Sequence, residues 1–340
     1  MRLLVITQKI DRNDTVLGFF HGWVTEMSKK VESIEVICLE KGIYDLPKNV
    51  TVYSLGKENG VSKLRYIYNF YKYLHLIHGS YDSVFVHMNQ EYIVLAGLYW
   101  KMKNIPVYLW RNHPKGSLIT KFVIALCTKV FCTSTSSFTA KYKKTVIMPA
   151  GIDTNIFKAV NGVVRKKYSI CMVGRVAPIK HNDLAIFAIQ ELVSSGTQVS
   201  LTILGTFLER DRLYMESIKK YVEDNNLSSV IYFLPGVEMS KLPEIYSSHE
   251  ICLNFTDSGS FDKTIVEAAA CGAIPLVSNS SLKGMLPDLC IIEPDKKSIA
   301  ESIQKLLVPH NRIEAQKELE PFVVSQSLSG LISKIFIEIK

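Results

Sequence analysis

The chain has 340 residues, of which 47% are hydrophobic and 21% charged, and its formal net charge is +8. This length and balance predict a globular protein with two domains that have separate cores. No apolar run is long enough to cross a bilayer, so we expect no membrane-spanning helix.

The positive charge is concentrated in the first 160 residues, which carry 21 Lys and Arg residues against 11 Asp and Glu. A basic half predicts an anionic partner, such as a lipid phosphate, a membrane surface or an acidic glycan, or else a solvated basic surface. We expect no nucleic-acid partner, because the sequence has no helix-turn-helix, zinc-finger or RRM pattern.

Seven cysteines are scattered along the chain without any C-x-x-C pair. Their odd number and apolar surroundings indicate buried, reduced thiols and a reducing compartment. An apolar strand pattern starts directly after Met1 and Arg2, so we expect no signal peptide and a cytoplasmic location. A peripheral position at the inner face of a membrane is an alternative that the basic half leaves open.

Apolar strands alternate with amphipathic helices through the first half of the chain. This alternation predicts a doubly wound α/β domain with a parallel sheet. The expected strands are Leu3–Thr7, Ile34–Leu39, Val50–Leu55, Ser83–His87, Pro106–Leu109, Val130–Thr133 and Val146–Met148. The expected helices are Leu17–Lys30, Ser62–His78, Glu91–Lys103 and Leu118–Thr128.

The helix expected at Ser62–His78 combines three basic residues with aromatic residues and histidines. That composition fits a helix lying on a membrane surface. It also fits an ordinary amphipathic helix, which we favour, with a core-facing side made of Leu64, Ile67, Phe70 or Tyr71, and Leu74.

A polar link, Lys158 to Lys167, leads to a second alternation of strands and helices. We therefore expect one domain at residues 1–160, a second at 161–322 and a last helix within 323–340. The expected strands are 168–173, 199–204, 230–234, 251–255, 274–277 and 289–292, and the late helices are Ser298–Leu307 and Gln326–Ile339.

Two cations follow the first strand of the second half. Gly174 permits a sharp exit from that strand, and Arg175 and Lys180 leave its carboxyl end. Since ligands of open α/β sheets bind at the carboxyl ends of strands, the two cations would cradle a pyrophosphate. Taken singly, each is as well explained by a solvated surface charge.

Residues 257–278, DSGSFDKTIVEAAACGAIPLVS, form a pattern of small-residue loop, short helix and buried strand. The free N–H groups and the dipole of a first helical turn favour an anion, and Lys263 lies in that turn. A glutamate one turn further on, Glu267, would take the two hydroxyls of a ribose. The segment therefore predicts a nucleotide-diphosphate site formed by Gly259, Ser260, Phe261, Asp262, Lys263, Thr264 and Glu267.

Four segments of the chain resemble the retaining GT-B glycosyltransferases of family 4, the glycosyl transferases group 1. They are GID followed by Phe at 151–157, VGRVAPIK at 173–180, FLPGV at 233–237 and VEAAACGAIPLVS at 266–278, in the family's order. The resemblance implies two Rossmann-like domains facing a central cleft, the first for the acceptor and the second for the nucleotide sugar. It also implies a last helix that crosses back to the first domain.

The resemblance gives roles to individual residues. Glu267 would bind the ribose of the donor, Pro235 would lie near the base, and the cations at 175 and 180 would stabilise the leaving pyrophosphate. His113 matches by layout the histidine of the first domain that lies near the donor sugar or the acceptor, although a surface turn histidine is the alternative. Gly18 would let the first helix approach the donor phosphates. His87 and His21 are weaker candidates.

One position departs from the family's pattern. The family usually has another glutamate eight positions before Glu267, and this chain has Gly259 there. Asp262 is a candidate substitute for that carboxylate. No D-x-D motif is present, so we expect the pyrophosphate charge to be met by cations and helix N–H groups, without a metal or another cofactor.

These observations predict an enzyme that transfers a sugar from a nucleotide-diphosphate donor to a hydroxyl of a glycan or lipid-linked acceptor, with retention of configuration. Polysaccharide and lipid-linked glycan assembly is the family's usual setting. A sugar-nucleotide epimerase of the same fold is an alternative. So is a non-catalytic sugar-nucleotide binding protein, which the departure at Gly259 favours.

Overall fold

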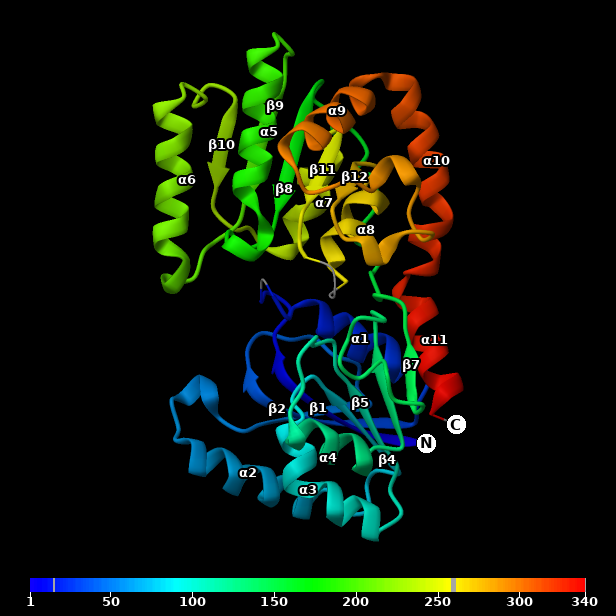
Figure 1. Cartoon of the computed structure of the whole chain (residues 1–340). Helices are drawn as coiled ribbons and strands as arrows, with labels where there is room; N and C mark the ends of the chain where they lie inside the picture. Colours follow the sequence, from blue (N-terminus) through cyan, green and yellow to red (C-terminus); the bar gives the residue numbers. More distant parts are fainter. Residues whose placement is uncertain (15, 258–260, 340) are drawn as a thin grey trace. The chain divides into compact units, whose positions relative to one another are not determined.

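Two parallel β-sheets organise the chain, one in each half (Figure 1). The computed structural model describes residues 1–14, 16–257 and 261–339. The first sheet has seven strands in the order β3-β2-β1-β4-β5-β6-β7, and the second has five in the order β10-β9-β8-β11-β12. Neighbouring strands pair in parallel throughout both sheets. The predicted pair of doubly wound domains is therefore confirmed.

The first unit comprises residues 1–151, Phe261 and the segment that begins at Leu328. Its strands are β1 (Arg2–Ile10), β2 (Ser33–Lys41), β3 (Val50–Ser54), β4 (Ser83–His87), β5 (Val107–Trp110), β6 (Lys129–Cys132) and β7 (Thr145–Ile147). Its helices are α1 (Phe19–Ser28), α2 (Lys63–Leu76), α3 (Glu91–Met102), α4 (Leu118–Leu126) and α11 (Leu328–Glu338).

Helices cover both faces of the seven-stranded sheet. On one face, side chains of α2, α3 and α4 such as Phe70, Trp100 and Val123 form a buried core with the sheet. On the other face, α1 and α11 supply Trp23 and Leu331 to a second core. A sheet buried on both faces needs apolar side chains in both directions, which explains why its strands read as continuous apolar runs.

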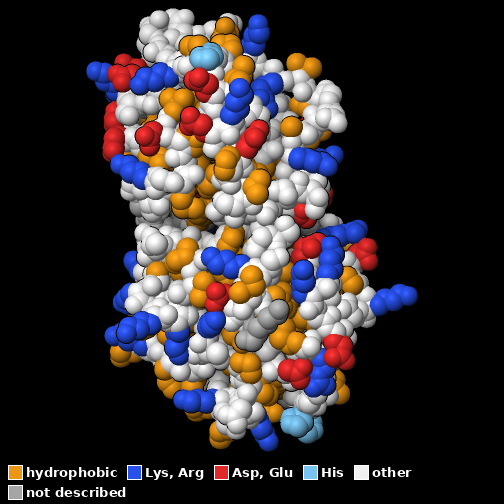
Figure 2. All heavy atoms as spheres, turned by 90° about the vertical axis from the view of Figure 1, so that its right-hand side faces the viewer, with side chains coloured by type: hydrophobic (Ala, Val, Ile, Leu, Met, Phe, Trp, Pro, Cys, Tyr) orange, Lys and Arg blue, Asp and Glu red, His pale blue; other side chains and the backbone are white. Residues whose placement is uncertain are grey.

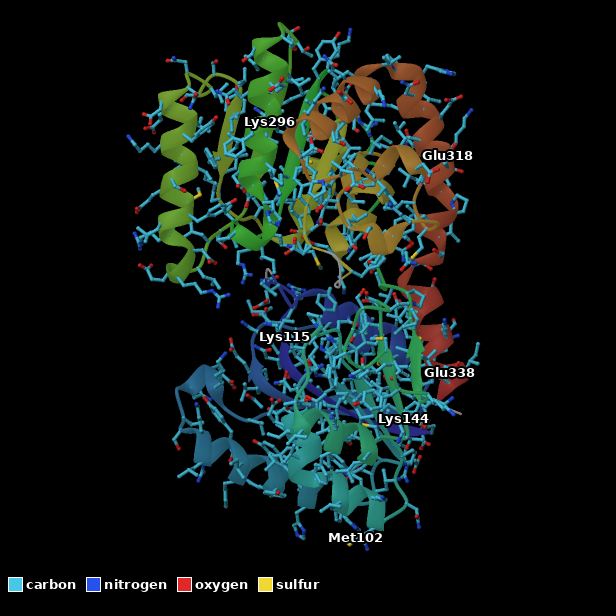
Figure 3. All side chains as sticks on the ribbon, in the orientation of Figure 1. Met102, Lys115, Lys144, Lys296, Glu318 and Glu338 are labelled. Carbon is cyan, nitrogen blue, oxygen red and sulfur yellow. The ribbon has the colours of Figure 1, made fainter. Side chains whose placement is uncertain are left out.

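The last helix completes the first unit. Tyr108 of β5 donates a hydrogen bond to the carbonyl oxygen of Ile339 (3.2 Å), and Lys129 of β6 forms an ion pair with Glu338 (2.7 Å). Glu338 is labelled in Figure 3, at the end of α11. The Lys334 ammonium donates to the carbonyl oxygen of Ile147 at 2.7 Å. Helix α11 is thus joined to the sheet by polar bonds as well as by its apolar side.

The second unit comprises residues 152–258 and 262–327. Its strands are β8 (Ser169–Val173), β9 (Ser200–Leu204), β10 (Ile231–Leu234), β11 (Ile251–Asn254) and β12 (Ile274–Val277). Its helices are α5 (Asn182–Ser194), α6 (Arg212–Asp224), α7 (Leu242–Ser247), α8 (Lys263–Ala270), α9 (Lys296–Leu307) and α10 (Pro309–Ser325).

Three details differ from the sequence-based expectations. The strand expected at 289–292 is absent: Asp288–Cys290 is a 3₁₀ turn, and Ile291 forms one isolated bridge with Val277. The sequence also gave no sign of α10 as a separate helix. The units divide at Gly151, ahead of the boundary expected at residue 160, and the last segment joins the first unit from Leu328.

Helix α2 does not present the predicted side to the core. Phe70 and Leu74 are buried as expected, whereas Leu64, Ile67 and Tyr71 are exposed. Helix α2 therefore carries more apolar side chains than the core of the first unit buries. Among the described residues, no helix combines the length and apolar content that a membrane span needs.

Candidate nucleotide site

The centre of the second sheet offers a ligand position. Strand β8 pairs with β9 on one side and β11 on the other, so the direction of the chain's winding reverses between β8 and β11. In open α/β sheets the crevice at such a reversal, outside the carboxyl ends of the strands, is where ligands bind. A small cavity of about 10 Å³ lies there, lined by Gly174, Arg175, Lys180, Asn182, Asn254 and Thr256, among others.

Close backbone packing shapes the exit from β8. The Gly174 N–H donates to the carbonyl oxygen of Leu204 (3.0 Å), and Gly174 itself has a φ of 137°, which favours glycine. A Cβ added to Gly205 would lie 1.8 Å from the carbonyl oxygen of Gly174, so a side chain at Gly205 would displace this turn. The chain then passes through a 3₁₀ turn, Pro178–Lys180, which brings Lys180 toward the end of β11.

Lys180 is held by two side chains of the second unit. Its ammonium donates to the hydroxyl of Thr256 at 2.9 Å and forms a short ion pair with the carboxylate of Asp262. Arg175, in contrast, is exposed, and its guanidinium has no hydrogen bond or ion pair within the described ranges. One cation is therefore fixed in place before any ligand binds, and the other is free to reach one.

Asp262 joins the two halves of the site. Its side chain caps α8 by accepting the N–H of Thr264 at 3.2 Å, and it also accepts the hydroxyl groups of Thr264 (3.1 Å) and Thr256 (3.2 Å). Burial on its own would raise the pKa of Asp262, but the Lys180 charge and these hydrogen bonds outweigh it, and the pKa lies below its usual value. Asp262 is therefore ionised, and both of its carboxylate oxygens already accept hydrogen bonds within the second unit.

Glu267 lies one turn into α8, with only 8% of its surface exposed. The hydroxyl of the fully buried Tyr246 on α7 donates to Glu267 Oε2 at 3.2 Å. Burial raises the pKa of Glu267 to about 7, against the opposing charge of Lys263. The same burial lowers the pKa of Lys263 to about 7, and the charge of Glu267 opposes that shift. A polar ligand at this end of α8 would meet a carboxyl group whose pKa lies near neutral pH.

Most of the site residues predicted between positions 174 and 267 gather here. Gly174, Arg175 and Lys180 lie at the end of β8, and Asp262, Lys263, Thr264 and Glu267 lie in the first two turns of α8. Phe261 is half-buried directly before Asp262. Pro235 is exposed after β10, the edge strand, and does not line the cavity. Gly259 and Ser260 lie outside the described residues.

The two predicted residues of the first unit lie at ends of its own strands and helices. His113 follows β5 and is exposed, and the Lys115 N–H donates to its Nδ1 at 3.0 Å. Gly18 precedes α1, where its N–H donates to the carbonyl oxygen of Asp14 (3.1 Å) and an added Cβ would lie 2.5 Å from that oxygen. The need for glycine at position 18 therefore arises within the first unit itself.

Three residues of the site were not predicted. Thr256 binds both Lys180 and Asp262, and Asn254 donates to the hydroxyl of Thr264 at 2.9 Å. Their place at the carboxyl end of an apolar strand, Asn254 as its last residue and Thr256 just after it, is a signal that sequence reasoning could have used. Tyr246 gives no such signal, because only the packing of α7 on α8 directs its hydroxyl to Glu267.

Comparison with known proteins agrees with this geometry. Residues 153–318 match the family model of glycosyl transferases group 1. The chain is 23% identical over 171 residues to the D-inositol 3-phosphate glycosyltransferase of Segniliparus rotundus, covering 45% of this chain and 38% of that protein. It is 21% identical over 206 residues to the phosphatidylinositol N-acetylglucosaminyltransferase GPI3 subunit of Saccharomyces cerevisiae, covering 58% of this chain and 44% of that protein. The matches thus span less than half the length of these relatives.

Solved structures match over the whole chain. The crystal structure of Anabaena Alr3699/HepE in complex with UDP has a TM-score of 0.78 at 15% identity, covering 100% of this chain and 99% of that one. Sucrose-phosphate synthase from Thermosynechococcus elongatus has a TM-score of 0.77 at 13% identity, covering 99% and 98%. At these identities the likeness establishes the fold, which is GT-B.

Proposed function

We infer that the chain, whose residues 153–318 match the family model of glycosyl transferases group 1, is an enzyme that transfers a sugar from a nucleotide-diphosphate sugar to an acceptor hydroxyl. One observation carries this proposal: Arg175, Lys180 and the first turn of α8 converge where the second sheet reverses its winding. Such a convergence of cations and helix N–H groups suits a pyrophosphate.

The chemistry follows from where charge develops. As the bond between the anomeric carbon and the pyrophosphate lengthens, negative charge grows on the leaving phosphate oxygen. Lys180, already fixed by Thr256 and Asp262, would stabilise that charge without first reorganising, and the exposed Arg175 would close on it. We propose that the reaction proceeds with retention and without a metal, because the cations and the N–H groups of α8 supply the positive charge.

Glu267 would accept hydrogen bonds from the ribose hydroxyls of the donor. The role requires an ionised carboxylate: burial raises the pKa of Glu267 to about 7, and the nearby Lys263 opposes that rise and favours the ionised form. The Tyr246 hydroxyl fixes the orientation of the carboxylate from the buried side. We propose Lys263 and the N–H groups of Lys263 and Thr264 as further contacts to the phosphates.

We propose that the acceptor is a glycan or lipid-linked hydroxyl bound by the first unit. The relatives support this class only by their names, one for an inositol phosphate acceptor and one for a phosphatidylinositol acceptor. UDP is the first nucleotide to test, since a structure of the same fold was solved with it. His113 and Gly18 are the proposed contacts of this unit.

A panel of UDP, GDP, ADP, dTDP and CMP with their common sugars tests the proposal. We expect one nucleotide diphosphate to raise the melting temperature selectively, and its sugar to pass to an acceptor with the α or β configuration preserved, as read by NMR. Selective binding without transfer to any acceptor pool would favour the non-catalytic alternative. Release or epimerisation of the sugar without an acceptor would favour the epimerase.

A further inference from the structure

The outer sides of α2, α3 and α4 form a surface that the core does not explain. These helices pack side by side on one face of the first sheet, and their inner residues make the core described above (Figure 1). Their outer sides carry large apolar residues exposed to solvent: Leu64, Ile67, Tyr68, Tyr71 and Leu76 on α2, Val94, Leu98 and Met102 on α3, and Leu118, Ile119 and Phe122 on α4. We call this set the outer apolar face.

The exposure of this face is extensive. Leu64 is 79% exposed, Met102 76% and Leu118 80%, one on each helix. In Figure 3 the labelled Met102 points away from the ribbon of α3. The residues recur at helical spacing, as at 94, 98 and 102, so that they share one side of each helix. Singly exposed leucines are common, but a shared side on three neighbouring helices marks an interaction surface.

The charge on the same three helices is almost entirely positive. Six exposed cations accompany the apolar residues: Lys63, Arg65, Lys72, Lys101, Lys103 and Lys121. Helices α2 and α4 contain no carboxylate, and α3 contains only Glu91. Figure 2, which looks from the side of α11, shows hydrophobic and Lys or Arg side chains interspersed over the first unit, with some Asp and Glu side chains among them. The occupant of this surface is therefore apolar and anionic.

A groove between α2 and α3 adds depth to the face. Its volume is about 430 Å³, and its lining includes Tyr71 and His75 of α2, Tyr99 of α3, and Lys103. Tyr71 bridges the two helices by donating to the carbonyl oxygen of Leu95 at 2.9 Å. The groove has an apolar floor with a cation and histidine at its rim, so it can receive part of an acyl chain below an anionic headgroup.

We propose that the outer apolar face docks on an anionic lipid bilayer. Apolar side chains would enter the boundary between headgroups and acyl chains, while the long Lys and Arg side chains reach the lipid phosphates. Insertion of apolar side chains and attraction of basic side chains to anionic lipids together give stable binding, whereas either contribution alone gives only marginal binding. An acidic protein partner would satisfy the cations, but it would also have to match apolar side chains spread over three helices and a groove, whereas a fluid bilayer adapts to them.

The proposal does not depend on the proposed function, because its test needs no sugar donor. The purified chain is mixed with vesicles of phosphatidylcholine alone or with added phosphatidylglycerol, and the fraction that sediments is measured at several salt concentrations. We expect sedimentation with the anionic vesicles and little with the neutral ones. Added salt should reduce it, since the attraction to the lipid phosphates is screened.

Two sets of variants locate the contact. The triple variant Leu64→Ser, Leu98→Ser, Leu118→Ser should lower vesicle affinity at least about tenfold. The matched control is Leu213→Ser on α6 of the second unit, where Leu213 is also 79% exposed, and it should change nothing. Lys72→Glu and Lys101→Glu should each lower affinity about fivefold or more, with Lys167→Glu as the control.

Three outcomes would overturn the proposal. The wild-type chain could remain in solution with anionic vesicles at low salt. The triple variant could sediment with the vesicles to the same extent as the wild-type chain, in which case another surface makes the contact. Light scattering could show a dimer that the triple variant dissociates, in which case the face joins two copies of the chain. Thermal melting of each variant, compared with Leu213→Ser, separates lost docking from lost folding.

Discussion

The two sheets share one strand order but carry different chemistry at their centres. In the first sheet β1 lies between β2 and β4, and in the second β8 lies between β9 and β11. At the first centre, Thr7 contacts His87 (3.3 Å) and the ring of Phe20 stacks on His87 with centroids 4.0 Å apart. At the second centre, glycine, threonine and two cations surround a cavity. The same topology thus positions a site, and side-chain size decides whether it stays open.

The lysines near the two centres differ in how many carboxylates pair with them. Lys9 at the end of β1 forms ion pairs with Asp14 (2.9 Å) and Glu40 (2.7 Å), so carboxylates of the first unit already neutralise its charge. Lys180 after β8 has one carboxylate partner, Asp262, and Arg175 beside it has none among the described residues. Among the described residues, the second centre thus holds a cation, Arg175, that no carboxylate pairs with, and an anionic donor would neutralise it.

The largest expected effect comes from removing Lys180. Because Lys180→Met alone would leave Asp262 buried and unpaired, the variant to use is Lys180→Met with Asp262→Asn. We expect kcat to fall about 100-fold or more, since a fixed cation at the leaving group is lost. Nucleotide affinity is measured in parallel by calorimetry, with Lys9→Met as the control that should leave the affinity unchanged. An unaltered kcat in the double variant would remove Lys180 from the mechanism.

The next effect concerns stability at the same ion pair. Asp262→Asn should lower the free energy of unfolding by about 2 kcal/mol at neutral pH, because a buried charged hydrogen bond is lost. The folded-state pKa of Asp262 is lowered, so its contribution is present above the ordinary value of 3.8 and is lost as the pH falls through the folded-state pKa. Urea unfolding of both proteins should converge at low pH. A difference that stays constant with pH would show that the charge is not responsible.

A smaller effect is expected at the ribose. Glu267→Gln should weaken binding of the nucleotide about tenfold, which corresponds to one charged hydrogen bond. The pKa of Glu267 is raised to about 7, so the preference for a ribose over its 2′,3′-dideoxy analogue should decline as the pH falls through 7. The glutamine variant should show a low preference at every pH. Comparing the two analogues cancels any effect of Lys263 on the phosphates.

The smallest effect is expected at Thr256. Thr256→Val keeps the shape of the side chain but removes the hydroxyl that binds Lys180 and Asp262, so we expect a loss of about 1 kcal/mol, or roughly fivefold in kcat/KM. Thr202→Val, on β9 of the same sheet, is a control that should leave kcat/KM unchanged. Equal values for both variants would mean that Lys180 does not need its second anchor.

Much of the fold was predictable because buried parallel strands are short apolar runs separated by helices. The failure at 289–292 has the same basis: Cys290 and Ile292 are buried, but against the sheet's edge, with one bridge in place of a ladder. Burial and strand pairing produce the same apolar pattern. The outward side of α2 shows the converse, since helical spacing indicates an apolar side but not what covers it.

The candidate site was predictable where a residue follows a strand or opens a helix, as Arg175, Lys180 and Glu267 do. The hydrogen bonds and ion pairs that connect these residues were not predictable. Asp262 is 82 residues from Lys180 in the sequence, and only the turn after β8 and the start of α8 bring the two together. Asp262 as a substitute for the carboxylate missing at Gly259 stays a prediction, although its present bonds leave it little capacity for a sugar.

The return of α11 to the first unit has a consequence for the order in which the protein is made. A ribosome releases the whole second unit before it releases the segment from Leu328 onward, and Trp23 and Tyr108 need that segment as their partner. The unit that begins first must therefore finish last, holding part of its core open throughout synthesis. A chain truncated after Ser327 should thus be open to proteases within residues 1–151 while residues 152–327 are protected.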